Sequence, residues 1–419
     1  MMRMSKSKDA LIRVENVSKT FGKEKDKALE LRRSGKNKDE VEVETKTTVA
    51  ILDASFEVKQ GETFVLIGLS GSGKSTLLRC LNGLIPPTEG MVYLENDDIA
   101  HLGKKQLQHI RRNKMGMVFQ NVGLLPNRTV LENITFGLEI NGIPAHMRDK
   151  KGRDAMELVG LNGQAYKRIH ELSGGMQQRV GLARALASNQ EILLMDEPFS
   201  ALDPLIRREM QKLFLDIQDE IHKTVIFVTH DLDEALTLGQ RAAVMKDGEI
   251  VQIGTAEYIL SQPATEYVKK LVQDVDYSKI RQAKSAMSTV DVFALEHESP
   301  QVVLRRMKAK KRSSILVVNE MQTLIGALPI ERVVELVEFH KQDLTNVKLE
   351  RPMCVHPAVA LREVIPLLVN RQLPVAVVNE QNRLIGQIDK DSLIASLTEQ
   401  IDVDSGNVNE VLQKEVSQR

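Results

Sequence analysis

The segment from Gly68 to Ser75 fits the pattern G-x-x-x-x-G-K-[S/T]. Glycine lets a backbone wrap so closely that its N–H groups point inward and bind phosphate oxygens. In this pattern the Lys74 ammonium reaches the β- and γ-phosphates, and the Ser75 hydroxyl is a ligand for Mg²⁺. The residues predicted to bind a triphosphate are Gly68, Ser70, Gly71, Ser72, Gly73, Lys74, Ser75 and Thr76.

A pair of acidic residues supplies the second half of this chemistry. Asp196 and Glu197 follow the apolar run at residues 192–195, so they lie where a buried strand ends. Ligands bind at the carboxyl ends of strands in open α/β sheets. Because side chains alternate along a strand, Asp196 can hold Mg²⁺ while Glu197 faces the attacking water. A solvated turn is the alternative interpretation of such a pair, but beside the phosphate loop the pair predicts triphosphate hydrolysis.

These groups need strands and helices to position them. The apolar run at residues 63–67 predicts a strand that ends at the phosphate loop, with a helix starting near Thr76. Up to about residue 260, short apolar runs alternate with amphipathic segments, which is typical of an α/β sheet buried on both faces. Residues 22–47 carry many charges of both signs and predict a solvated insertion that is in part helical.

The second part of the chain contains an internal duplication. Residues 317–320 recur as residues 377–380, and residues 324–326 recur as residues 384–386. The offset predicts two repeats, at 285–340 and 345–398, each with the order helix, strand, turn, strand, helix. Residues 399–419 lack an apolar period, and we expect a mobile acidic tail there.

Composition excludes several other classes of protein. Among 419 residues, Lys and Arg together number 57 and so do Asp and Glu, so the net charge is zero. Neutrality and the absence of Trp argue against binding to nucleic acid. No apolar run approaches the ~20 residues of a membrane span, and residues 1–17 lack the apolar core of a signal peptide. Cys80 and Cys354 make no disulfide framework, so we expect a cytosolic location.

The segment Leu172–Arg179 resembles the signature motif of ATP-binding-cassette (ABC) ATPases. Other landmarks of that family occur in the family's order. Gln120 is similar to the Q-loop glutamine, Asp203 to the D-loop aspartate and His230 to the switch histidine. Phe21 is similar to the aromatic residue that stacks on adenine. The resemblance implies an α/β fold of the P-loop NTPase class, ABC type, with a mixed-sheet core.

The expected domain spans residues 1–275, with a helical subdomain at about 120–185. The residues Ser173, Gly174 and Gly175 precede a predicted helix, so their N–H groups and the helix dipole make a second anion site. In the family this site meets the phosphate loop of a partner, which implies a dimer of two copies with two ATP molecules between them. Gln120 would sense Mg²⁺ and the γ-phosphate, and Asp203 would organise the two sites across the interface.

Several segments resemble one branch of the family, the ATP-binding subunits of importers for glycine betaine, proline betaine, choline or carnitine. These segments are Gly68–Gly71, Gln177–Arg184 and Phe199–Arg207. The branch also carries a tandem CBS (α+β) module, which the duplication resembles. This implies a subunit on the cytoplasmic face of the cell membrane, paired with a permease that has a solute-receptor domain. ATP and Mg²⁺ would be its cofactors, and import would serve osmoprotection.

The signal that the CBS pair senses stays open between cyclic di-AMP and ionic strength. Residues 305–312 include six basic side chains, which are a solvated helix face or a site for anionic lipid.

Three alternatives to the betaine importer also remain open for the function of the whole protein. They are an importer ATPase for another small solute, a non-transport ABC ATPase, and a regulatory module that only senses nucleotide.

Overall fold

The structure is a computed structural model that describes residues 10–120, 122–273, 281–290, 292–369 and 373–398. The chain divides into two compact units, with the boundary between residues 275 and 276. The expected tail at 399–419 lies outside the described residues. The predicted α/β class is confirmed in the first unit, and the second unit is α+β.

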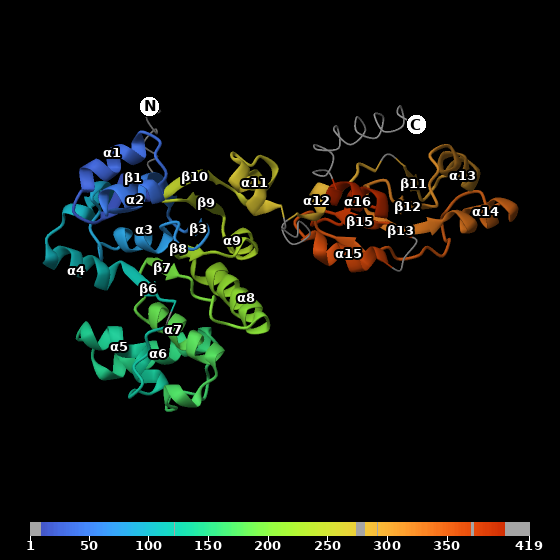
Figure 1. Cartoon of the computed structure of the whole chain (residues 1–419). Coiled ribbons are helices and arrows are strands. Elements are labelled where there is room, and N and C mark those ends of the chain that lie inside the picture. The colour runs from blue at the N-terminus through green and yellow to red at the C-terminus, as the bar shows by residue number, and fades with distance from the viewer. Residues whose placement is uncertain (1–9, 121, 274–280, 291, 370–372, 399–419) are drawn as a thin grey trace, which may run out of the picture. The chain divides into compact units, whose positions relative to one another are not determined.

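A six-stranded sheet forms the centre of the first unit (Figure 1), in the order β10-β9-β3-β8-β7-β6. All of its neighbouring strands are parallel except β9 and β10. Every residue of β3, β7 and β8 is buried, as the continuous apolar runs predict. The strands are β3 (Thr63–Ile67), β6 (Met115–Val118), β7 (Ile192–Asp196), β8 (Thr224–Thr229), β9 (Arg241–Lys246) and β10 (Glu249–Gly254).

A second, antiparallel sheet packs against the first. Its order is β2-β1-β4-β5, and its strands are β1 (Ala10–Phe21), β2 (Thr48–Lys59), β4 (Glu89–Leu94) and β5 (Asp97–Asp98). Phe56 of β2 stacks on Phe64 of β3 with ring centroids 5.0 Å apart, so the two sheets share one apolar core. Large apolar rings packed this way supply much of the free energy that holds two layers together.

Helices cover these sheets and form a separate helical subdomain. In the subdomain α5, α6 and α7 pack on one another, apart from α3 and α4 (Figure 1). Thr129 and Glu132 make a capping box at the start of α5. The helices are α3 (Lys74–Leu81), α4 (Lys104–Asn113), α5 (Val130–Ile140), α6 (Ala145–Leu158), α7 (Gly174–Ala187), α8 (Pro204–Ile221), α9 (Leu232–Leu238), α10 (Ala256–Ser261) and α11 (Glu266–Val272).

The charged insertion is more ordered than its composition predicts. It forms two helices, α1 (Lys25–Arg33) and α2 (Lys38–Thr45), that pack on β2. Leu29 and Val41 are fully buried in a small cluster with Val49 and Leu52. The insertion is thus helical in part and largely exposed, as expected. The buried face was not predicted, and it forms because a few apolar residues at helical spacing give the insertion a small core of its own.

Two similar three-stranded sheets build the second unit. In each, a hairpin has the same register: Val317 pairs with Gly326, and Val377 pairs with Gly386. Each sheet also has a short first strand that the repeat pattern did not predict. The elements are α12 (Ala283–Ala286), β11 (Phe293–Leu295), α13 (Pro300–Ala309), β12 (Ser314–Val318), β13 (Leu324–Pro329), α14 (Ile330–Glu338), β14 (Cys354–Val355), α15 (Leu361–Val369), β15 (Val375–Val378), β16 (Leu384–Ile388) and α16 (Lys390–Thr398).

Candidate ATP hydrolysis site

The phosphate loop lies between the end of β3 and the start of α3, as predicted. Two of its glycines are required by the space around them. A Cβ at position 73 would lie 2.3 Å from the Ala50 carbonyl oxygen, and Gly73 has a φ of +100°. A Cβ at position 68 would lie 2.2 Å from the Met245 carbonyl oxygen. Side chains at these positions would move the loop away from β2 and β9.

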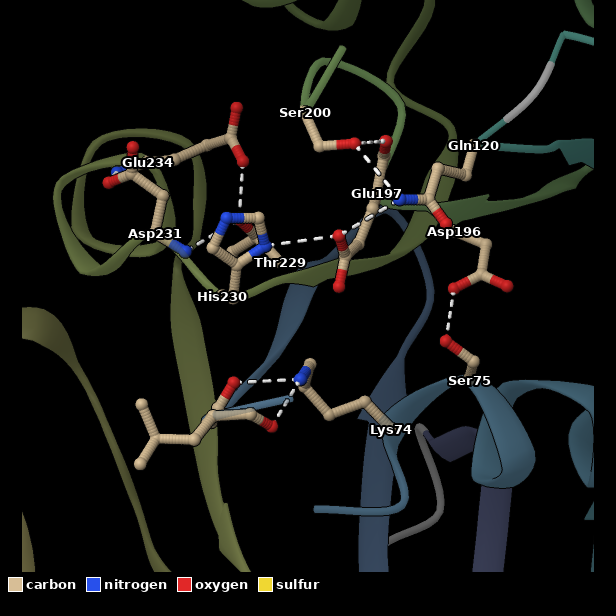
Figure 2. A network of polar contacts seen from close by, with 12 residues as sticks. Lys74, Ser75, Gln120, Asp196, Glu197, Ser200, Thr229, His230, Asp231 and Glu234 are labelled. Atoms are coloured by element: carbon tan, nitrogen blue, oxygen red, sulfur yellow. Dashed lines mark hydrogen bonds and ion pairs between the residues drawn. The ribbon is translucent and has the colours of Figure 1, made fainter. Parts of the chain in front are cut away.

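Lys74 is the first residue of α3, and it is almost fully buried. Its ammonium donates to the carbonyl oxygens of Gly68 at 2.7 Å and Leu69 at 2.9 Å (Figure 2). Burial lowers the pKa of this ammonium, while the carboxylates of Glu197 and Asp196 oppose the change. The charge therefore sits inside the loop, where a triphosphate would replace the carbonyl oxygens as its partner.

Ser75 and Asp196, the residues predicted to bind Mg²⁺, contact each other. The Ser75 hydroxyl donates to Asp196 Oδ1 at 2.6 Å, and Arg79 lies 3.6 Å from the other carboxylate oxygen. Among the described residues, no group of three or more His, Cys, Asp or Glu side chains could hold a metal alone. Mg²⁺ commonly takes one or two protein oxygens and completes its shell with phosphates and water. The hydroxyl and carboxylate therefore fit Mg²⁺ that arrives with a triphosphate.

One further hydroxyl supports this fit. Ser72 is 4% exposed, and its Oγ is one of the buried side-chain atoms that have no hydrogen-bond partner in the described part of the chain. A buried hydroxyl without a partner costs free energy. A phosphate oxygen held in the loop would give this hydroxyl an acceptor.

Glu197 is the centre of a second group of contacts (Figure 2). Its Oε2 lies 3.0 Å from His230 Nδ1 and 3.4 Å from Gln120 Nε2. Gln120 also lies 3.3 Å from the Ser200 hydroxyl. The structure thus brings together three residues that the sequence analysis assigned to one reaction, from the ends of β6, β7 and β8. Glu197 points away from Asp196 partly because its φ is +46°, a turn that simple strand alternation does not predict.

The switch segment, residues 228–231 around His230, is bound by buried polar groups of α8 and α9. Thr229 donates its hydroxyl to the Glu234 carboxylate, and Gln211 of α8 donates to the other carboxylate oxygen at 3.1 Å. Burial raises the pKa of Glu234, while these two hydrogen bonds oppose the change. These hydrogen bonds link the end of β8, just before His230, to α9 and α8.

The signature residues and the D-loop aspartate lie at the starts of α7 and α8, away from the contacts of Lys74 and Glu197. Ser173 caps α7, where its hydroxyl accepts from Met176 N, and a Cβ at Gly175 would meet Ile206 of α8 at 2.6 Å. A Cβ at Gly174 would meet nothing within 4 Å. Asp203 caps α8 by accepting from two backbone N–H groups, both at 3.1 Å. The contacts of these residues do not reach the phosphate loop of the same chain.

Phe21 ends β1, next to the inserted helices. It is 46% exposed, and the Lys19 ammonium lies 5.2 Å from the centre of its ring. The insertion also reaches the phosphate loop, because Lys38 Nζ donates to the Gly71 carbonyl oxygen at 2.9 Å. The inserted helices therefore border the predicted adenine and phosphate positions.

Several residues of this region had no assigned role in the sequence analysis. They are Lys38, Arg79, Ser200, Arg207, Gln211, Thr229, Asp231 and Glu234. Four of them occur inside or beside motifs that were singled out, but their partners come from other helices and loops. Only the contacts in the folded chain distinguish them from ordinary surface residues.

Comparison with known proteins agrees with this geometry. Residues 51–200 match a family model described as ABC transporter, and residues 345–399 match the CBS domain model. The chain is 45% identical over 390 residues to the glycine betaine/carnitine transport ATP-binding protein GbuA of Listeria monocytogenes, covering 92% of this chain and 97% of that protein. The chain belongs to the ABC transporter family. The predicted family and fold are thereby confirmed, and the ABC ATPase also carries the expected CBS module.

Two further comparisons extend this result. The ABC ATPase is 46% identical over 388 residues to the glycine betaine transport ATP-binding protein OpuAA of Bacillus subtilis, covering 92% of each protein. Its fold matches the structure of cbiO1 from Clostridium perfringens, part of the ABC transporter complex cbiONQ. That match has a TM-score of 0.51 and 25% identity, and covers 64% of this chain and 96% of that one. ATP binding and hydrolysis coupled to transport follow from this membership.

In the CBS module, backbone hydrogen bonds join the two repeats at their hairpin turns. Leu324 N donates to Asn382 O at 3.1 Å, and Leu384 N donates to Gln322 O at 3.0 Å. A cavity of about 210 Å³ lies between the repeats. It is lined by Thr289, Val290, Phe293, Val318, Gln322, Leu384 and Ile385.

The basic cluster at residues 305–312 is divided between two roles. Arg306 pairs with Glu298 at 2.6 Å, and Arg312 of the first repeat pairs with Asp389 of the second at 2.9 Å. Arg312 therefore joins the two repeats, while Arg306 makes its contact inside the first repeat. The exposed basic residues of the cluster are Arg305, Lys308, Lys310 and Lys311.

In the part of the chain that the structure describes, every helix is too short or too polar to cross a membrane.

Proposed function

We propose that this protein is the ATP-hydrolysing subunit of an importer for glycine betaine or a related quaternary amine. The observation that carries the proposal is the identity of 45% and 46% to two betaine transport ATP-binding proteins over 92% of the chain. The likeness includes the CBS module as well as the ATPase unit. The solute itself would be held by a permease and its receptor domain, because the described ATPase site is built for phosphates.

The proposed mechanism assigns a step to each residue of the site. Backbone N–H groups of residues 68–75 and the Lys74 ammonium would bind the triphosphate. Mg²⁺ held by Ser75 and Asp196 would neutralise charge on the β- and γ-phosphates. Glu197 would accept the proton of the attacking water, and general-base catalysis of this kind contributes about 10²–10⁴-fold. His230, whose Nδ1 lies 3.0 Å from Glu197 Oε2, would contact the γ-phosphate and fix the active geometry.

The proposal includes a second copy of the chain. Ser173 and Gly175 lie at the start of α7, where the helix dipole and N–H groups favour an anion. In a head-to-tail dimer these residues would meet the γ-phosphate held by the partner's phosphate loop. Gln120 would sense that state, Asp203 would organise the interface, and Phe21 would stack on adenine.

Regulation by the CBS pair is a further part of the proposal. Arg305, Lys308 and Lys311 are exposed, so they are available to an anionic lipid surface. The attraction would weaken as salt shortens the Debye length, so high internal salt would release the transporter. Cyclic di-AMP remains the alternative signal. Arg306 and Arg312 are ion-paired within the module. The support for the ionic mechanism is therefore the exposure of Arg305, Lys308 and Lys311 on α13 and the turn that follows it.

Uptake into proteoliposomes tests the proposed function. The chain would be assembled with its permease and offered glycine betaine, proline betaine, choline and carnitine, at low and high internal salt and with cyclic di-AMP. We expect ATP-dependent uptake of at least one amine. Hydrolysis without uptake of any amine would favour an importer for another solute, and failure to co-purify with a permease would favour a non-transport ATPase.

The ionic mechanism has its own test in the same vesicles. Changing Arg305, Lys308 and Lys311 to Gln should give uptake that no longer needs high internal salt in vesicles rich in anionic lipid. Salt activation identical to that of the unchanged protein would contradict the lipid mechanism.

A further inference from the structure

Arg207 lies in the first turn of α8, and its guanidinium contacts two loops. Its Nη1 lies 3.4 Å from Asp231 Oδ2, next to the switch histidine. Its Nη2 donates to the carbonyl oxygens of Ser200 at 3.4 Å and Leu202 at 3.2 Å, in the D-loop. A guanidinium has a rigid fork of donors, so it can hold acceptors on two loops at once.

These contacts close a ring around the catalytic carboxylate. The Ser200 hydroxyl donates to the Glu197 carbonyl oxygen at 3.0 Å, and Glu197 Oε2 lies 3.0 Å from His230 Nδ1. His230 is joined to Asp231 by the chain, and Asp231 contacts Arg207. Arg207 returns to Ser200 and completes the ring. A displacement of the D-loop is therefore constrained by the switch loop, and the reverse also holds.

A second contact from the same helix supports this arrangement. Gln211 lies four residues after Arg207, so both side chains are on one face of α8. Gln211 donates to Glu234, which is 4% exposed and accepts the Thr229 hydroxyl. The switch segment is thus held by α8 on both sides of His230. The helix that begins at the D-loop is the support for the switch segment.

We propose that Arg207 is a positioning residue that couples the D-loop to His230 within one subunit. The inference rests on the proposed function, because the D-loop meets the second copy in the ATP-bound dimer. When that copy shifts residues 200–203, Arg207 carries the shift to Asp231 and so to His230 beside Glu197. Arg207 acts through these loops and makes no contribution of its own to phosphate binding.

Asp231 offers a variant that separates coupling from folding. Its Oδ1 caps α9 by accepting from Glu234 N at 3.2 Å, while its Oδ2 faces Arg207. Asparagine is as good an N-cap as aspartate, so Asp231→Asn keeps the cap and removes the acceptor that faces Arg207. Arg208→Ala is the matched control, because Arg208 is the next residue on α8 and is exposed.

The test measures ATP hydrolysis by the purified full-length chain against ATP concentration. For Arg207→Ala we expect kcat to fall about tenfold, which corresponds to about 1.4 kcal/mol. The ATP Kd should stay within about twofold and the Hill coefficient should fall towards one. Arg207→Lys should be intermediate, because an ammonium is a single compact charge. Arg208→Ala should match the unchanged protein.

A double-mutant cycle decides whether Arg207 acts through Asp231. If it does, Arg207→Ala combined with Asp231→Asn should cost no more in kcat than the larger single effect. Additive losses, an unchanged kcat in Arg207→Ala, or a change confined to KM would overturn the proposal. Hydrolysis that is absent in the unchanged chain, or that persists in Lys74→Ala, would instead count against the proposed function.

Discussion

Replacing Glu197 by Gln is the sharpest perturbation of the reaction that the structure offers. Glutamine has the same length, so it can still accept from Gln120, but it has no carboxylate to take a proton from water. His230 Nδ1 lies 3.0 Å from Glu197 Oε2. In the glutamine variant this hydrogen bond needs Nδ1 to carry a proton where it faces the amide oxygen, or to carry none where it faces the amide NH₂. The polar surroundings of the site are otherwise kept.

The expected loss follows from the step that is removed. General-base catalysis contributes about 10²–10⁴-fold, so we expect kcat to fall about 10³-fold. The carboxylates of Glu197 and Asp196 both stabilise the charged form of Lys74. They do not stabilise bound phosphates, which carry the same negative charge. Removing one negative charge from a triphosphate site should therefore leave the ATP Kd unchanged or make it smaller.

The assay is steady-state phosphate release, combined with ATP binding and size-exclusion chromatography in ATP and Mg²⁺. The variant should bind ATP, accumulate as a dimer and release little phosphate. Glu191→Gln is the matched control, since Glu191 precedes β7 and accepts from Gln60 at the surface. A residual rate within about tenfold of the unchanged protein would refute the assignment of Glu197 as the base.

Three further predictions follow from the contacts described above. Lys38→Ala should raise the KM for ATP a few-fold with little change in kcat, since it removes the cation beside Gly71. The control Lys36→Ala should leave the KM unchanged, because Lys36 pairs with Glu44 inside the insertion. Equal KM values for the two variants would contradict a role of Lys38 in ATP binding. Gly73→Ala should abolish measurable ATP binding in equilibrium titrations, because the new Cβ meets the Ala50 carbonyl at 2.3 Å; normal binding would show that the loop can move. Burial raises the pKa of Asp389, but hydrogen bonds from Ser392 and Arg312 outweigh it, so the net pKa is lowered. Its stabilising effect is present above the unfolded pKa of about 4 and lost as pH falls through the lower folded value. Thermal unfolding should therefore show a Tm that falls with acidification, and less so in Asp389→Asn.

Local patterns in the sequence were enough for the phosphate loop, the Asp–Glu pair and the buried strands. The full pattern G-x-x-x-x-G-K-[S/T] between a strand and a helix predicts a phosphate loop, because its glycines let the backbone wrap closely and present its N–H groups. The continuous apolar runs of β3, β7 and β8 likewise require burial on both faces. Gln120 and His230 were recognised by their order and by resemblance, since a lone Gln or His carries no such constraint.

The tertiary structure decided which distant groups meet. Arg207 is one arginine on a helix until the fold places two loops against it, and Lys38 is one charge in a charged insertion until α2 packs on β2. Their roles depend on contacts between residues far apart in sequence, which no local period encodes. The same reason explains the pairing of Arg312 in the basic cluster, because its acidic partner Asp389 comes from the other repeat.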